Sequence, residues 1–276
     1  MTHKIGIIGF GNMGSAIAER LKNDYKVAVF EKDPAKTGKA TGIHVAKDLH
    51  ELINESDTLI LAIKPQDFPQ VFIEIKNSGH QLDKLVISIA AGIPVVYIEE
   101  HFGAIRVIRA MPNMPAKIGA GITCLAKGRF ASAEDLGLAK ELFGYLGETL
   151  SIKEDLMNAA TAIVGSGPGF LYDLIEGKSL SEAKKYSQGI FTPLLKEAAM
   201  NSGFSEDEAG LMAEVTAAGS IAVLEKTKTS PQELASQVVS KGGTTEAGLA
   251  VLHHGGTLAE AVSAALKRAD ELSRRG

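Results

Sequence analysis

The first half of the chain alternates short apolar runs with stretches in which apolar residues recur every three or four positions. The runs at residues 5–8, 58–63 and 85–89 are almost wholly apolar, as is typical of strands buried on both faces of a sheet. The stretch at 68–75 between two of them has the period of an amphipathic helix. Strands that alternate with helices predict a parallel, doubly wound sheet.

From about residue 155 the strand pattern stops and helical spacing continues to the end of the chain. The segment Ser205-Glu206-Asp207-Glu208 has the form of a capping box that opens a long helix. Glycine-rich segments at 165–169 and 242–245 interrupt the helical pattern and are predicted to be loops. We therefore expect an α/β domain over residues 1–154 and an all-α domain over residues 155–276.

Three glycines follow the first apolar run with the spacing Gly9-x-Gly11-x-x-Gly14, and a helical pattern starts directly after them. In this fingerprint the glycines permit a tight turn, a close approach of backbone to a pyrophosphate, and close packing of helix on strand. The next strand ends at Glu31, where an acidic residue commonly accepts a hydrogen bond from a ribose hydroxyl. The sequence thus predicts a Rossmann-type domain that binds a dinucleotide, with a glycine-rich turn that binds no nucleotide as the alternative.

Composition narrows the class of protein further. The chain has 276 residues, 45% of them hydrophobic, and a formal net charge of -4, which gives no electrostatic reason to expect nucleic acid or an anionic membrane as a partner. The single cysteine, Cys124, excludes an internal disulfide and has apolar neighbours, so we expect a core residue in a reducing cytoplasm. No run has transmembrane length and no signal peptide is evident, so a soluble cytoplasmic protein is predicted. His253-His254 has no third ligand at metal spacing, so we predict a helix end and no metal site.

Two segments offer groups that suit a ligand. Backbone N–H groups and hydroxyls of the Gly-Gly-Thr-Thr segment 242–245 could hold a carboxylate at a helix N-terminus, although a plain connection between helices is an equal explanation. Asn113 lies in the segment Met-Pro-Asn-Met-Pro, and its side chain can both donate and accept. It would suit the carboxamide of a nicotinamide, although a turn asparagine explains it as well.

Taken together and in this order, the motifs resemble the pyrroline-5-carboxylate reductase family over nearly the whole chain. The segments that carry the resemblance are residues 9–14, 62–65, 111–115, 165–168 and 231–245. It implies a Rossmann-type domain that binds NADH or NADPH, followed by an all-α domain that forms an intertwined homodimer, often assembled into a ring-like decamer. It also implies reduction of 1-pyrroline-5-carboxylate to L-proline by hydride transfer to the ring imine carbon.

The resemblance assigns roles to individual residues. Those expected against the cofactor pyrophosphate are Gly9, Gly11, Asn12, Met13 and Gly14. Further cofactor contacts are expected from Ala62, Lys64, Pro65, Ala90 and Asn113. The substrate is expected to contact Val238, Gly243, Thr244 and Thr245, and Thr245 matches the threonine that the family places against the ring nitrogen. Because a cyclic imine is partly protonated near neutrality, positioning and electrostatics can carry the rate without a strong acid.

The chain departs from the family pattern at several places. Val239 stands where Ser, Thr, Ala or Cys is usual, and Gly169-Phe170 replaces Ala-Tyr. Residues 173–192 have the form of an insertion, which we expect to be a solvated excursion or, alternatively, a lid or an altered oligomer contact.

The cofactor preference rests on residues at the end of the second strand. Glu31 favours NADH, because a carboxylate accepts a bond from the 2′-hydroxyl and repels a 2′-phosphate. Lys32 and Lys36 are close enough in sequence to offset that repulsion, so the preference for NADH over NADPH is expected to be slight.

Two other functions stay open on the sequence alone. The first is a related reductase that acts on another cyclic imine or on a 3-hydroxy acid. A hydroxy-acid enzyme of this kind would need a catalytic lysine, and neither Lys153 nor Lys178 lies in a matching motif. A non-catalytic nucleotide-binding homologue has only the insertion and Phe170 in its support, and the intact Thr244-Thr245 pair argues against it.

Overall fold

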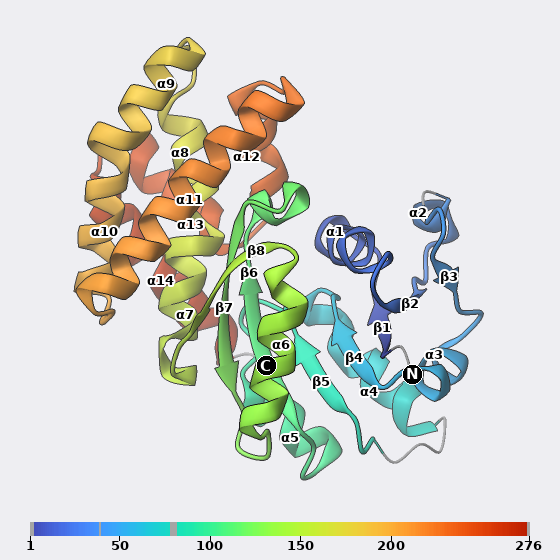
Figure 1. Cartoon of the computed structure of the whole chain (residues 1–276). Helices are drawn as coiled ribbons and strands as arrows, with labels where there is room; N and C mark the ends of the chain where they lie inside the picture. The colour runs from blue at the N-terminus through green and yellow to red at the C-terminus, as the bar shows by residue number, and fades with distance from the viewer. Residues whose placement is uncertain (1–2, 39, 78–81, 275–276) are drawn as a thin grey trace. The chain divides into compact units, whose positions relative to one another are not determined.

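The computed structural model describes residues 3–38, 40–77 and 82–274 (Figure 1). Within these residues the strands form one sheet of eight, in the order β3-β2-β1-β4-β5-β6-β7-β8. The strands are β1 (Lys4–Ile8), β2 (Lys26–Phe30), β3 (His44–Val45), β4 (Thr58–Leu61), β5 (Leu85–Ser88), β6 (Val107–Pro112), β7 (Gly121–Lys127) and β8 (Gly147–Ser151).

The first six strands confirm the predicted parallel, doubly wound sheet. All neighbouring strands from β3 through β6 pair in parallel, and β4 and β5 are buried at every position. Helices alternate with these strands: α1 (Asn12–Leu21), α2 (Pro34–Thr37), α3 (Leu49–Glu55), α4 (Phe68–Asn77), α5 (Val95–Phe102) and α6 (Ala133–Gly144). The strand order 3-2-1-4-5-6 is that of a Rossmann fold, which brings the carboxyl ends of β1 and β4 side by side.

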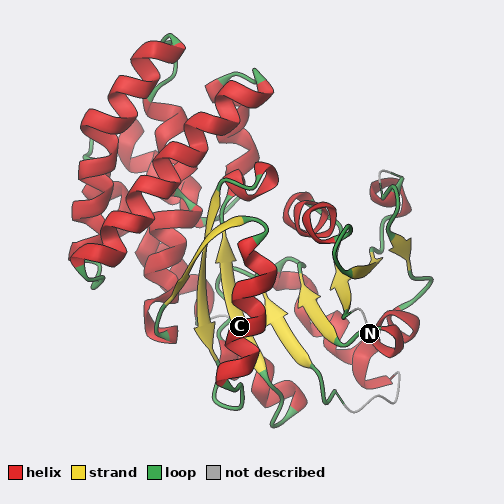
Figure 2. Ribbon diagram, viewed as in Figure 1, coloured by secondary structure: helices red, strands yellow, loops and turns green. Residues whose placement is uncertain are grey.

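The last elements are helical, as predicted (Figure 2). They are η3 (Glu154–Leu156), α7 (Met157–Ala160), the π-helical turn η4 (Thr161–Gly165), α8 (Gly167–Leu174), α9 (Leu180–Tyr186), the π-helical turn η5 (Ser187–Phe191), α10 (Thr192–Asn201), α11 (Glu206–Thr227), α12 (Pro231–Val238), α13 (Thr244–His253) and α14 (Leu258–Ser273). The expected capping box opens α11, because the Ser205 hydroxyl and the Glu208 carboxylate bond each other's backbone N–H groups. The predicted helix end at His253-His254 is also confirmed.

The chain divides into two compact units that do not follow the chain order. The first unit comprises Met1–Ala110 and Leu125–Tyr145, and the second comprises Met111–Cys124 and Leu146–Arg275. The boundary after residue 154 that the sequence favours stays a prediction. Cys124 is fully buried, which confirms it as a core residue, and burial raises the pKa of its thiol to about 12.

Three sequence-based expectations are wrong. Residues 165–169 do not form a loop: the turn η4 runs through Ser166 into α8, and Pro168 lies in the first turn of that helix, where no N–H is needed. Thr244 and Thr245 begin α13 instead of preceding it. Residues 173–192 are not a solvated excursion, because α9 and η5 bury Ala183, Ser187 and Phe191.

Two smaller differences concern the sheet. Strand β6 extends to Pro112, into the segment that the sequence marks by its two prolines, and β8 was not predicted. Both lie where polar or proline residues obscure the strand period.

Candidate cofactor and substrate sites

The glycine turn between β1 and α1 has the form that a pyrophosphate needs. Gly9 has a φ of +100°, and a Cβ added at Gly14 would lie 2.2 Å from the Gly9 carbonyl oxygen. A Cβ at Gly11 would meet nothing within 4 Å, so this side of the turn is open. Gly11 is also the N-cap of α1 and provides no side-chain cap, which leaves the first N–H groups of the helix available to an anion.

A hollow of about 420 Å³ adjoins this turn in the first unit. Six of the predicted cofactor residues line it: Gly9, Gly11, Glu31, Lys32, Ala62 and Lys64. The sequence-based list missed the polar residues of η1 (Pro65–Asp67) and α4 that also line it: Gln66, Asp67, Gln70 and Glu74. Three of them recur every three or four residues directly after the fourth strand, and this spacing was the signal that could have revealed them.

Glu31 is the best-anchored side chain of the hollow, and only 7% of it is exposed. Its Oε2 accepts a bond from the backbone N–H of Phe10 at 2.8 Å, and its Oε1 accepts one from the N–H of Asp33 at 3.1 Å. Lys36 Nζ lies 3.5 Å from Oε1. A carboxylate offers about four lone-pair positions, so Oε2 keeps capacity for a ribose hydroxyl.

Two of the three lysines around the hollow are held by carboxylates. Lys32 Nζ lies 2.7 Å from Asp67 Oδ1, and this bond raises the pKa of Lys32. Lys36 is shared between Glu31 and Asp33. A 2′-phosphate would therefore have to compete with carboxylates for Lys32 and Lys36.

The remaining predicted cofactor residues occupy different surroundings. Asn12, Met13 and Gly14 form the first turn of α1, and Pro65 begins η1. Ala90 is 3% exposed and packs in the core of the first unit, so its side chain serves packing. Their contacts with a cofactor remain predictions.

Asn113 belongs to the second unit and is 2% exposed. Its Oδ1 accepts a bond from the Ile122 N–H at 3.0 Å, and its Nδ2 donates to Thr216 Oγ1 at 3.5 Å. The side chain thus joins η2 (Met114–Ile118) to β7 and α11. One Nδ2 hydrogen remains for a ligand, and the predicted contact with nicotinamide stays a prediction.

The start of α13 holds the predicted substrate residues in the second unit. Gly243 is its N-cap and provides no side-chain cap, and Gly242 has a φ of +70°. The Gly242 N–H donates to Glu246 Oε2 at 2.7 Å, and the Gly242 carbonyl accepts from Arg268 Nε at 2.7 Å. The turn is therefore held through both the N–H and the carbonyl of Gly242 before any ligand arrives.

Ser166 connects the two threonines, and the sequence-based site list omitted it. Its Oγ lies 3.0 Å from Thr244 Oγ1 and accepts a bond from Thr245 Oγ1 at 3.2 Å. Ser166 is fully buried, Thr245 is 5% exposed, and Thr244 is partly exposed. A Cβ added at Gly169 would lie 2.6 Å from Thr245 Cγ2 and 3.3 Å from Val238 Cγ1, so the structure brings Val238 and the threonines together against α8.

One cluster lies apart from both sets of residues. His44, Glu51 and Glu55 offer ligand atoms within 4.8 Å of one another among the residues that the structure describes. His44 Nε2 is 3.0 Å from Glu51 Oε1, and His44 and Glu55 are exposed, so the cluster reads as surface ion pairing.

Comparison with known proteins decides the family. A family profile for pyrroline-5-carboxylate reductase dimerisation matches residues 190–272, and one for coenzyme F420-dependent NADP oxidoreductases matches residues 4–92. A pyrroline-5-carboxylate reductase of Synechocystis is 33% identical over 100% of both chains. The chain belongs to the pyrroline-5-carboxylate reductase family. The reductase of Methanosarcina acetivorans is 34% identical over 99% of this chain and 98% of its own.

Solved structures of pyrroline-5-carboxylate reductases agree with this assignment. The Coxiella burnetii protein has a TM-score of 0.65 at 30% identity and covers 99% of each chain. The Plasmodium falciparum protein, solved with NADP bound, has a TM-score of 0.63 at 27% identity and covers 98% of each chain. Within the part of the chain that the structure describes, no helix is both long and apolar enough to cross a membrane.

Proposed function

We propose that this protein reduces 1-pyrroline-5-carboxylate to L-proline with a nicotinamide cofactor. The observation that carries the proposal is the start of α13, where Thr244 and Thr245 meet Ser166 beside an N-terminal helix turn that has no side-chain cap. Family membership over the full chain supports the same reaction.

The first unit has the features that a dinucleotide requires. The open side at Gly11 and the first N–H groups of α1 would receive the pyrophosphate, and Glu31 would accept a ribose hydroxyl. When bound, the nicotinamide supplies a hydride to the imine carbon, while the C=N electron pair moves to the ring nitrogen. The residues of the chain bind and orient the reactants, and the rate comes from that positioning.

The second unit has the features that the substrate requires. The N–H groups at the start of α13 and the Thr244 hydroxyl would hold the substrate carboxylate. Thr245 would contact the ring nitrogen, and Val238 would border the ring. The protonated imine is already a good hydride acceptor, so the reaction needs no histidine, cysteine or carboxylate pair as an acid beside these threonines.

We further propose NADH as the preferred cofactor. Glu31 is fixed by two backbone N–H groups, so it cannot easily withdraw from a 2′-phosphate. Lys32 and Lys36 are each held by carboxylates, so a 2′-phosphate would have to displace an ion pair.

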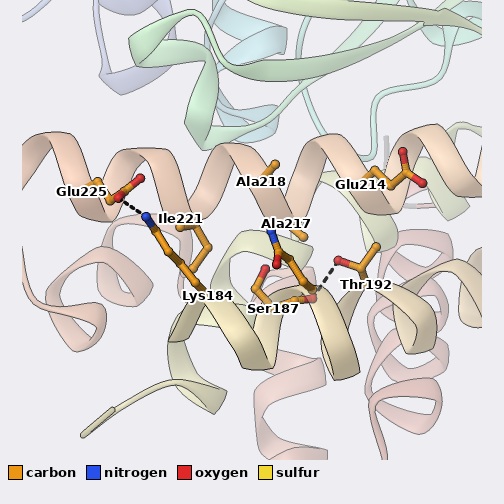
Figure 3. A pocket seen from close by; sticks show the side chains of 9 residues that line it. Lys184, Ser187, Thr192, Glu214, Ala217, Ala218, Ile221 and Glu225 are labelled. Carbon is orange, nitrogen blue, oxygen red and sulfur yellow. Dashed lines mark hydrogen bonds and ion pairs between the residues drawn. The ribbon is translucent and has the colours of Figure 1, made fainter. Parts of the chain in front are cut away.

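A homodimer through the helical segment is the proposed assembly, and the match of residues 190–272 to the dimerisation profile supports it. Exposed and half-buried residues on one face of α11 form a stripe: Leu211, Glu214, Val215, Ala218, Ala222 and Glu225. Two hollows of about 530 and 430 Å³ adjoin this stripe, and both are lined by Glu214 and Ala218. Figure 3 shows the larger hollow, with Lys184 of α9 reaching Glu225 of α11. A second copy would fill these hollows, while a larger ring stays a prediction.

The reaction is tested by its product. Incubation of the purified protein with 1-pyrroline-5-carboxylate and NADH is expected to yield L-proline, identified by chiral amino-acid analysis. Binding of NADH, followed by fluorescence, with no proline formed would reject the proposed reaction while leaving a nucleotide-binding protein.

A further inference from the structure

Thr245 is held from two sides at the start of α13. Its Oγ1 donates to Ser166 Oγ at 3.2 Å, and its methyl carbon occupies space that a side chain at position 169 would take, since a Cβ on Gly169 would lie 2.6 Å away. A β-branched side chain with both substituents placed has a single χ1 rotamer. The direction of the Thr245 oxygen is therefore fixed by Ser166, just before α8, and by Gly169, in the first turn of that helix.

The hydroxyl of Ser166 is placed by the π-helical turn that precedes it. The Ser166 N–H bonds the Thr161 carbonyl, five residues earlier, at 3.0 Å, and Ser166 Oγ lies 3.4 Å from the same oxygen. Thr244 Oγ1 lies 3.0 Å away. A hydroxyl has one proton and two lone pairs, so Ser166 can give its proton to Thr161 or to Thr244. In either arrangement it keeps a lone pair for the proton of Thr245.

We propose that Ser166 and Gly169 are positioning residues. They keep the Thr245 hydroxyl donating its proton to Ser166, so that Thr245 Oγ1 can only accept a hydrogen bond from the substrate. The inference rests on the proposed function. It also specifies the form of the substrate that the site selects, which is the protonated iminium. The iminium carries an N–H that can donate to Thr245, whereas a neutral imine nitrogen needs a donor.

The chemistry balances without a proton from Thr245. Hydride adds to the iminium carbon, the C=N electron pair becomes the nitrogen lone pair, and the N–H bond is kept throughout. The nicotinamide is oxidised and the iminium is reduced. The amine takes its second proton from water after the step.

The first test removes the Ser166 hydroxyl and uses the removal of a second buried serine hydroxyl as the control. Ser220 is also fully buried, and its Oγ donates to the Thr216 carbonyl at 2.7 Å, four residues earlier in the same helix. Ser166→Ala is expected to lower kcat about tenfold, as for a modest misplacement of a reacting group, with a smaller change in KM. Ser220→Ala is expected to keep kcat, and both variants should show similar melting temperatures. Equal kcat values for the two variants would overturn the proposal.

The second test uses the space at Gly169. Gly169→Ala is expected to push the Thr245 methyl and to lower kcat by up to about 100-fold. Adding Thr245→Ser removes that methyl and keeps the hydroxyl, so the double variant should recover most of the loss. A double variant no faster than Gly169→Ala would overturn the role of Gly169, and the rescue also separates positioning from simple loss of folding.

The third test is the pH dependence of kcat/KM for total substrate in the unaltered protein. An acceptor hydroxyl requires the iminium, so kcat/KM should fall with rising pH in parallel with the iminium fraction, because a threonine hydroxyl does not titrate in this range. A rise of kcat/KM with pH would overturn the proposal. Absence of any turnover in the unaltered protein would reject the proposed function itself, whereas turnover with a fast Ser166→Ala variant would reject this inference alone.

Discussion

The Glu31 carboxylate accepts a 2.8 Å hydrogen bond from the Phe10 backbone N–H, 21 residues earlier in the chain. The bond ties the end of β2 to the glycine turn, so the acidic residue and the turn are held together. Charge-assisted bonds of this kind are shorter and stronger than neutral ones. Glu31 therefore shapes the turn, and we propose that it also selects the cofactor.

Replacing Glu31 by glutamine tests this selection. Glu31→Gln keeps an oxygen for the Phe10 N–H but removes the charge that repels a 2′-phosphate. The ratio of kcat/KM for NADH to that for NADPH is expected to fall about tenfold, the equivalent of one hydrogen bond to a charged group. Glu99→Gln is the control, because Glu99 also accepts a backbone N–H, from Arg129, outside the hollow. An unchanged ratio in Glu31→Gln would show that Glu31 does not set the preference.

Asp67→Asn should release Lys32 from the ion pair seen at 2.7 Å. The freed ammonium can then pair with a 2′-phosphate, so the KM for NADPH is expected to fall while the KM for NADH stays constant. Steady-state kinetics with both cofactors measures this directly. Equal changes in the two KM values would contradict the assigned role of the Lys32–Asp67 pair.

Two glycines of the turn should respond differently to alanine. Gly14→Ala places a Cβ 2.2 Å from a backbone oxygen, so it is expected to lower the melting temperature and to raise the Kd for NADH about tenfold or more. Gly11→Ala meets nothing within 4 Å and should raise the Kd alone, because the methyl occupies the path of the pyrophosphate. Gly137→Ala in α6, also open, should change neither quantity. Normal NADH binding by Gly11→Ala would argue against phosphates at this turn.

Thr245→Ala is expected to lower kcat about tenfold or more, because the group that orients the ring nitrogen is lost. The Kd for NADH should stay the same, because Thr245 is not among the residues that line the cofactor hollow. Stopped-flow measurement of hydride transfer separates this effect from product release. Full activity in Thr245→Ala would remove Thr245 from the mechanism.

Ala218→Glu tests the proposed dimer. The substitution adds a charge to this stripe of α11, between Glu214 and Glu225, and like charges at an interface destabilise association. A monomer is expected in light scattering coupled to gel filtration. Ala133→Glu, at an exposed position of α6 outside residues 190–272, should leave the dimer intact. A dimeric Ala218→Glu protein would place the interface elsewhere.

The sequence predicted the parts of the fold that strong local signals specify. The apolar runs gave the strands of the Rossmann-type half because a strand buried on both faces leaves no ambiguity of period. Ser205 and Glu208 marked the start of α11 because a capping box is a local device.

Other features depended on contacts distant in sequence. Ser166 is 79 residues from Thr245, and its motif reads as a glycine-rich loop although it continues a helix through a π turn. The pairing of Lys32 with Asp67 likewise spans 35 residues and cannot be read from either segment alone. Residues 173–192 contain many lysines and serines, which hid the three buried positions on one face of α9 and η5.

The most direct measurement follows absorbance at the NADH band after 1-pyrroline-5-carboxylate is added to the purified protein, with proline quantified in the same samples. The account predicts rapid oxidation, one proline for each NADH consumed, a faster reaction with NADH than with NADPH, and a much slower one in Thr245→Ala. Bound NADH that stays reduced in the presence of this substrate would contradict it.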